Sequence, residues 1–118
     1  MILYGIPNCD TVKKAREWLD AHGLAYELHD YKKRGLDGGR LRTWVDELGG
    51  EALINRRGTS WRKLDPALRD AVDEATAIRI MLENPSIIRR PVLDTGDGLL
   101  VGFAEDVYSG LLSRRPAP

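Results

Sequence analysis

The sequence of 118 residues contains only one cysteine and two histidines. A single cysteine excludes an internal disulfide, and it also excludes the cysteine-rich zinc sites found in small domains. The histidines, His22 and His29, are expected at the end of a helix and on the following strand, and they form no metal-binding pattern with Cys9. We therefore expect no resident metal and no bound cofactor.

The chain also lacks net charge and long apolar runs. Its 18 Lys and Arg side chains balance 18 Asp and Glu side chains, so the composition gives no support for a nucleic-acid or anionic membrane partner. No apolar run approaches the ~20 residues of a membrane span, and the N-terminus lacks the pattern of a signal peptide. We expect a cytoplasmic monomer with a single domain over residues 1–118, in a reducing compartment where a free thiol persists.

The one cysteine lies between a short apolar strand, residues 2–6, and an amphipathic helix, residues 10–22. Cys9 is therefore predicted at the first helical turn, where free N–H groups and the helix dipole favour an anion. Such a position lowers the pKa of a cysteine from its ordinary value of about 8.5. The alternative is a buried structural cysteine, since free Cys is among the most buried residue types. The placement between strand and helix favours the reactive thiol.

The rest of the sequence predicts an α/β chain with a helical segment in its middle. Residues 24–31 alternate in polarity like a second strand, which completes a β-α-β unit with parallel strands. Asp37 and Asp65-Pro66 are typical helix starts, and residues 87–103 predict a β-hairpin before a closing helix over 104–112. We therefore predict a thioredoxin-like β-α-β…β-β-α core, about 1–31 and 86–112, with a helical insertion of about 36–85. Residues 113–118 are predicted to be a frayed, flexible tail.

Three local predictions accompany this fold. The basic residues 32–35 are expected to form a solvated turn. The helix after Asp65 is expected to carry Leu68, Ala71 and Val72. The closing helix is expected to bury Val107, Tyr108, Leu111 and Leu112.

The thioredoxin-like prediction gives Cys9 the role of nucleophile. The usual redox motif is C-x-x-C, but its second position here is Val12, so the resolving thiol is missing. A single-cysteine enzyme must use an external thiol, such as glutathione. Arg90-Pro91 heads a strand opposite the cysteine, where proline is commonly cis in this fold. Arg90 would then stabilise the thiolate and hold an oxyanion or a glutathione carboxylate, and an ordinary surface position is its alternative.

A second pair of arginines lies in a polar loop. Either Arg56 or Arg57 is a candidate for the second contact to the anion, and a solvated basic pair is the alternative.

Three longer stretches and one short one resemble the arsenate reductase (ArsC) family, in particular its YffB-like branch, which is related to the Spx regulators. The matching stretches are YGIPNCDTVKKA (4–15), LINRRGTSWRKL (53–64), IRRPVL (88–93) and LVGF (100–103). The resemblance implies a thioredoxin-like core with a helical insertion and glutathione and glutaredoxin as reducing partners. It also implies Cys9 as the nucleophile, Arg90 before a cis Pro91, and Arg57 as the loop arginine, with Arg56 the other register.

The chain departs from the arsenate reductase pattern at two positions. Arsenate reductases carry a histidine four residues before the cysteine, where this sequence has Gly5, and a third anion-binding arginine where it has Phe103. Loss of one charge-assisted contact removes about 1.5–3 kcal/mol of binding, or roughly 10–150-fold. We therefore expect arsenate to be a weak substrate.

Together these observations predict a glutathione-dependent thiol/disulfide oxidoreductase. Cys9 attacks a disulfide sulfur or a small oxyanion, and Arg57, Arg90 and Pro91 bind the anionic ligand or glutathione. Asn8 orients the loop or contacts the ligand, and the backbone N–H groups of Asp10 and Thr11 are expected to face Cys9. The alternatives are an Spx-like, non-enzymatic transcriptional regulator that binds RNA polymerase, and a redox-inert glutathione-binding module.

Overall fold

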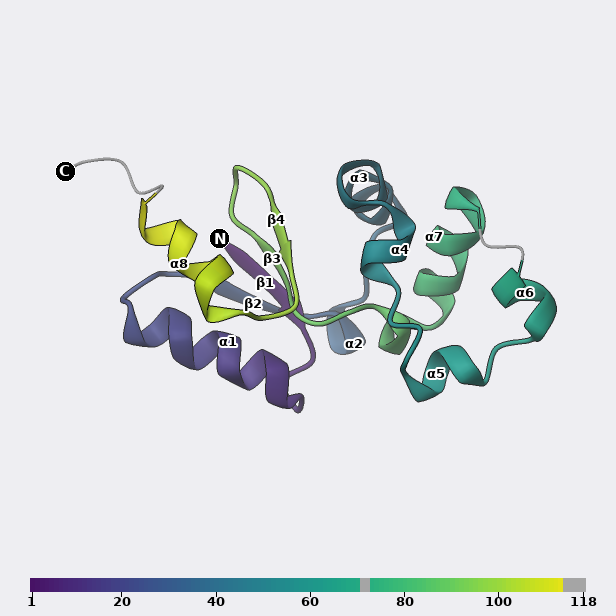
Figure 1. Ribbon diagram of the computed structural model, residues 1–118, viewed down its shortest axis with the longest axis horizontal. Helices are drawn as coiled ribbons and strands as arrows, with labels where there is room; N and C mark the ends of the chain where they lie inside the picture. The colour runs from purple at the N-terminus through teal and green to yellow at the C-terminus, as the bar shows by residue number, and fades with distance from the viewer. Residues whose placement is uncertain (71–72, 114–118) are drawn as a thin grey trace.

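The computed structural model describes residues 1–70 and 73–113, and its centre is a four-stranded sheet of order β2-β1-β3-β4 (Figure 1). The strands are β1 (Ile2–Gly5), β2 (Glu27–Asp30), β3 (Val92–Asp94) and β4 (Leu99–Val101). The helices are α1 (Asp10–Ala21), α2 (Tyr31–Arg34), α3 (Gly38–Leu48), α4 (Gly50–Leu53), α5 (Thr59–Arg62), α6 (Pro66–Asp70), α7 (Glu74–Glu83), the 3₁₀ turn η1 (Pro85–Ile87) and α8 (Glu105–Ser113).

The strand directions match the thioredoxin-like prediction. β1 pairs in parallel with β2 through the crossover helix α1, whereas β3 runs antiparallel to both β1 and β4. The five helices α3 to α7 all lie between β2 and β3 in the chain. The predicted thioredoxin-like core with a helical insertion is therefore confirmed.

Strand periodicity divides the hydrophobic core between the two faces of the sheet. Leu3 points toward α1 and α8 and packs with Leu19 and Tyr108, because successive side chains of a strand face opposite sides. Its neighbour Tyr4 packs instead with Trp44 and the other buried side chains of the insertion. In Figure 1 the sheet with α1 and α8 forms one half of an elongated molecule, and α3 to α7 form the other.

Local hydrogen bonds explain why several elements begin where they do. Asp37 caps α3 by accepting from the Arg40 backbone N–H at 3.2 Å, and Asp65 accepts from Ala67 N–H at 2.9 Å before α6. α1 ends before Gly23, which adopts a left-handed φ of 66°. These three boundaries follow from the sequence signals.

Other boundaries differ from the predictions. Residues 31–34 form the short helix α2 rather than a turn, because the Asp30 carboxylate accepts hydrogen bonds from the N–H groups of Lys32 and Lys33. The basic side chains are exposed to solvent, as predicted. The second strand and the hairpin strands are shorter than predicted. In α8, Tyr108 and Leu111 are buried, but Val107 is 50% exposed and Leu112 is 39% exposed.

Two predictions fall partly or wholly beyond the described ranges. Ala71 and Val72, expected on the helix after Asp65, lie outside them, as do residues 114–118 of the predicted tail. In the ranges 1–70 and 73–113, no helix has both the length and the hydropathy needed to cross a membrane.

Candidate active site

Cys9 is the N-cap residue of α1. Its backbone is extended, with φ of −139° and ψ of 128°, and its carbonyl accepts the first helical hydrogen bond from Lys13 N–H at 2.9 Å. The side chain of an N-cap residue meets the N–H groups of the second and third helical residues, which here are Thr11 and Val12. The sequence therefore folds into a helix start with a half-buried thiol at its positive end.

The pKa of the Cys9 thiol lies below its ordinary value. Burial acts to raise this pKa, but the Val12 N–H, the Arg90 guanidinium and the Thr11 N–H stabilise the thiolate and outweigh burial. The prediction named Asp10 and Thr11 as the facing amides. The amides that lower the pKa of Cys9 are instead those of Thr11 and Val12, although the Cys9 side chain forms no capping hydrogen bond of good geometry.

Arg90 is half-buried beside the thiol. Its Nη1 donates to the Ser86 carbonyl oxygen at 3.1 Å, so η1 holds the guanidinium in place. Burial acts to lower the pKa of Arg90, but the nearby Tyr31 and Cys9 raise it, and the guanidinium stays charged. The bond between Arg90 and Pro91 is cis, as predicted, and Pro91 is buried.

Tyr31 adds a buried phenol to this cluster. It is 1% exposed, and its hydroxyl has no hydrogen-bond partner of good geometry among the described residues. Burial raises the pKa of Tyr31 to about 12, although the adjacent Arg90 acts in the opposite direction. The phenol is therefore neutral and places no second negative charge near the thiolate.

Cys9 and Arg90 open into a cavity of about 260 Å³. The cavity is bounded by the β1–α1 turn, the start of α2, the loop before α5, and η1. Its lining contains two cationic side chains and several hydroxyl and amide groups, but no carboxylate. The lining residues are Ile6, Asn8, Cys9, Lys32, Asn55, Gly58, Thr59, Ser60, Ser86, Ile87 and Arg90.

Backbone hydrogen bonds join the loop before α5 to η1 and to the residues that lead into β3. Asn55 N–H donates to the Ile87 carbonyl at 2.8 Å, and Arg89 N–H donates to the Leu53 carbonyl at 2.7 Å. Ile54 and Ile88 form an antiparallel bridge between these bonds. The insertion therefore supplies one wall of the site.

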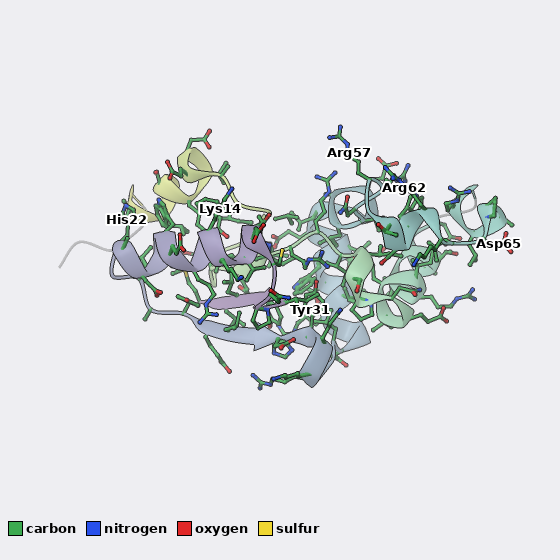
Figure 2. All side chains as sticks on the ribbon, turned by 90° about the horizontal axis from the view of Figure 1, so that it is seen from below. Lys14, His22, Tyr31, Arg57, Arg62 and Asp65 are labelled. Atoms are coloured by element: carbon green, nitrogen blue, oxygen red, sulfur yellow. The ribbon has the colours of Figure 1, made fainter. Side chains whose placement is uncertain are left out.

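Of the predicted site residues, Asn8, Cys9 and Arg90 line the cavity together, and Thr11 faces the thiol through its N–H group. Arg57 does not line it: its side chain is exposed, and Figure 2 shows it projecting from the edge of the molecule. Arg56 is bound to Glu51 at 3.5 Å and also lies outside the cavity. The loop contributes Asn55 and Gly58 instead, and the start of α5 contributes Thr59 and Ser60. A ligand contact by Arg57 stays a prediction.

Gly5 and Phe103, the two departures from the arsenate reductase pattern, have structural explanations. A Cβ atom at Gly5 would lie 2.9 Å from Val12 Cγ2, so a histidine at this position would overlap α1. Phe103 packs edge-on against Tyr108, with ring centroids 4.8 Å apart, and does not reach the Cys9 cavity.

Sequence reasoning did not select Tyr31, Lys32 or the loop hydroxyl groups. A signal for the first two existed in the register of the parallel strands. Gly5 pairs with Asp30, so the residues that leave β1 toward Cys9 and those that leave β2 toward Lys32 emerge at the same edge of the sheet. The loop residues carry no comparable signal, because their approach depends on the packing of the insertion.

A larger cavity of about 450 Å³ lies between α3 and the β3–β4 hairpin. Four of its lining residues are acidic, and none is a cysteine or histidine, so it offers no nucleophile. Within the described part of the chain, no three His, Cys, Asp or Glu side chains are grouped to hold a metal ion. The described site therefore combines a cysteine of lowered pKa, the Arg90 guanidinium next to it, and Lys32 elsewhere in the cavity lining.

Comparison with known proteins gives consistent results. The model of the ArsC family matches residues 4–111. A solved structure named YFFB (PA3664) protein is 53% identical, with a TM-score of 0.89, over 92% of this chain and 96% of that one. The solution structure of an arsenate reductase (ArsC) related protein from Brucella melitensis is 47% identical, with a TM-score of 0.76, over 94% and 92% of the two chains. The global transcriptional regulator Spx of Streptococcus mutans is 30% identical over 95% of this chain and 82% of its own length.

Proposed function

Because the chain belongs to the ArsC family, whose members are arsenate reductase-like or Spx-like, we propose that it is a cytoplasmic, glutathione-dependent thiol/disulfide oxidoreductase with Cys9 as its nucleophile. The observation that supports this proposal is the pairing of a stabilised Cys9 thiolate with the fixed Arg90 guanidinium in one cavity. Thiolate character is what disulfide exchange requires, and a cation beside the sulfur provides it without a base.

The proposed reaction has two exchange steps. The Cys9 thiolate forms a bond to one sulfur of a disulfide substrate, and the other sulfur leaves as a thiolate. A glutathione thiolate then attacks the substrate sulfur held on Cys9, which releases Cys9 and forms a mixed disulfide of glutathione and substrate. Arg90 stabilises the Cys9 thiolate before the first step and after the second. Glutaredoxin is the proposed protein partner for the removal of glutathione from such disulfides.

Arsenate is the second candidate substrate for the same thiolate. Arg90 and the N–H groups at the start of α1 are suited to an oxyanion. The absence of a histidine at Gly5 and of an arginine at Phe103 supports the ranking of disulfides above arsenate.

The proposal is tested by replacing the nucleophile. Reduction of glutathione-linked mixed disulfides and of arsenate is followed in an assay coupled to glutathione reductase, for the wild type and Cys9→Ser. We expect disulfide turnover by Cys9→Ser to fall to the uncatalysed background, with an unchanged circular dichroism spectrum. We expect the wild type to turn over arsenate more slowly than the disulfide, because one charge-assisted contact to the oxyanion is missing. Wild-type-like disulfide turnover by Cys9→Ser would exclude the proposed nucleophile.

The similarity to Spx supports a second candidate, a non-enzymatic regulator that binds RNA polymerase. Val12 occupies the place of the second cysteine of a C-x-x-C switch, which speaks against redox regulation of that kind. Enrichment of polymerase subunits in a pull-down, together with an inert Cys9, would favour the regulator. Glutathione binding without turnover of any disulfide or oxyanion would instead favour a redox-inert glutathione-binding module.

A further inference from the structure

We propose that Lys32 is a specificity-determining residue that binds a carboxylate of the thiol or disulfide entering the Cys9 cavity. Lys32 is the second cation in the cavity lining, besides Arg90, and it comes from a different wall, at the start of α2. The identification of the ligand as glutathione rests on the function proposed above. The anion-binding role of Lys32 itself rests only on the cavity.

The position of Lys32 is set by its backbone. The Lys32 N–H donates to Asp30 Oδ1 at 3.0 Å, and Asp30 is paired with Gly5 in the parallel register. The α-carbon of Lys32 is therefore fixed relative to the turn that carries Cys9. The side chain is exposed, and no salt bridge is formed by it among the described residues. An ammonium group in this setting is available to an incoming anion.

The two positive side chains in the cavity lining, without any carboxylate, favour an anionic ligand. Arg90 lies beside the sulfur, whereas Lys32 lies on the wall formed by α2, and no carboxylate lines the space around them. The remaining polar groups are amides and hydroxyls from Asn8, Asn55, Thr59, Ser60 and Ser86. These groups bind the polar backbone of a peptide without adding charge.

The size of the cavity leaves room for a ligand larger than a small oxyanion. Its volume of about 260 Å³ is about nine times the ~30 Å³ that one water molecule occupies in the liquid. A tetrahedral oxyanion bound at Arg90 would fill only a part of this space. A glutathione-like ligand, whose carboxylates lie at a distance from its sulfur, would place the sulfur at Cys9 and a carboxylate at Lys32.

The first experiment compares alkylation of Cys9 by anionic iodoacetate and neutral iodoacetamide. Cys9 is the only cysteine, so the rates report one site. Full pH profiles give the rate constant of the thiolate and remove any effect of its pKa. We expect Lys32→Gln to lower the iodoacetate constant about 2- to 5-fold, as for one exposed charge contact, and to leave the iodoacetamide constant unchanged. The difference should shrink as salt is raised.

Lys33 provides a matched control. It is the next residue of the same short helix, also exposed, and its N–H contacts the same Asp30 carboxylate, but its side chain does not line the cavity. We expect Lys33→Gln to keep the wild-type ratio of the two constants. Equal losses with both reagents, an unchanged ratio in Lys32→Gln, or the same change in Lys33→Gln would overturn the proposal.

The second experiment replaces the alkylating reagents with disulfides. Glutathione disulfide carries carboxylates, and bis(2-hydroxyethyl) disulfide carries none; each transfers one half to Cys9 and releases the other half as a thiolate. We expect Lys32→Gln to slow the reaction with glutathione disulfide about 2- to 5-fold and to leave the neutral disulfide unaffected. Equal slowing of both would overturn recognition of a carboxylate. A wild type inert to both disulfides, with Lys32-dependent alkylation, would refute the proposed function and support the anion subsite.

Discussion

At the scale of single residues, the pKa of Cys9 depends on a balance between burial, which raises it, and neighbouring groups that stabilise the thiolate and lower it. Half-burial alone would raise the pKa of Cys9, and the protein reverses this with two amide N–H groups and one guanidinium. Arg90 is in turn held by the Ser86 carbonyl and lies beside the neutral Tyr31 phenol. The lowered pKa of Cys9 is therefore a property of this small cluster and not of the cysteine alone.

The pH dependence of Cys9 alkylation measures that balance. Because the pKa of the thiol is lowered, the rate with iodoacetamide should reach half its maximum below the ordinary value of about 8.5. Replacement of the guanidinium in Arg90→Gln should move this midpoint upward, because a cation that stabilises the thiolate is removed. Arg89→Gln is the matched control, because Arg89 is adjacent, exposed and outside the cavity. An unmoved midpoint in Arg90→Gln would contradict the electrostatic role of Arg90.

The same pKa change has a consequence for stability, and its sign is fixed. The thiol is more acidic in the folded chain than in the unfolded chain, so ionisation stabilises the fold. This contribution is fully present above the unfolded pKa and is lost as the pH falls through the lower folded pKa. Urea unfolding of the wild type, compared with Cys9→Ser, should show a gain in the free energy of unfolding as the pH rises between these two values. A difference that is independent of pH would contradict it.

The sequence was sufficient to predict some of these residues and insufficient for others. Cys9 and Arg90 carry local signals, a strand-to-helix junction and an Arg-Pro dipeptide before a strand. The position of Lys32 near Cys9 can be predicted only when the register of the parallel strands is known, because that register places Asp30 beside Gly5. The outward position of Arg57 has no signal in the sequence, because it depends on how the loop is bonded to η1.

At the scale of elements, the close approach of β1 to α1 shapes the site. Gly5 ends β1 directly under Val12, and Val12 is fully buried on the first turn of α1. A β-branched valine has few rotamers in a helix, so it cannot easily move away from an added Cβ atom. The residue that replaces the usual resolving cysteine thus packs against the residue that replaces the usual histidine.

A double-mutant cycle tests this contact. We expect Gly5→Ala to destabilise the protein by about 1–3 kcal/mol through overpacking. In a Val12→Ala background, where the clashing methyl groups are absent, the same substitution should cost less. Urea unfolding of the four proteins gives the coupling energy between the two positions. Equal costs of Gly5→Ala in both backgrounds would show that the two residues do not compete for space.

Element boundaries were predicted best where a cap or a glycine defines them, as at Asp37 and Gly23. They were predicted worst where two elements follow without a loop. Asp30 ends β2 and caps α2 at once, so the exposed basic run after it is helical instead of a turn. Val107 was expected in the core because it is apolar, but α8 contacts the rest of the fold along a narrow stripe that includes Tyr108 and Leu111.

At the scale of the whole molecule, the sheet joins two hydrophobic clusters on its opposite faces. Trp44 of α3 packs edge-on against Tyr4 of β1, with ring centroids 4.9 Å apart, and the Ile54–Ile88 bridge ties the insertion to the chain that enters β3. The insertion therefore shares its core with the sheet. We infer that the two halves of the molecule unfold together.

The three tryptophans allow this inference to be tested. A Trp44→Phe/Trp61→Phe variant reports from Trp18 on α1, and a Trp18→Phe/Trp44→Phe variant reports from Trp61 in the insertion. Within each variant, we expect the urea midpoint from fluorescence to coincide with that from far-UV circular dichroism, as for one cooperative unit. A Trp61 transition at lower urea than the circular dichroism transition would show that the insertion unfolds first.

The presence of Val12 at the position of a second thiol also affects how long an adduct on Cys9 would last. An adduct on Cys9 has no neighbouring sulfur in the chain to displace it, so its departure is a bimolecular event. The lifetime of the adduct is then inversely proportional to the concentration of the thiol that removes it, and it lengthens when that supply falls. In a protein with a second, resolving cysteine, that thiol would displace the adduct in an intramolecular step, whose rate does not depend on the concentration of external thiol. If Cys9 forms mixed disulfides as proposed above, the external thiol sets the rate of release, and at a fixed rate of adduct formation the occupied fraction of Cys9 rises as that thiol is depleted.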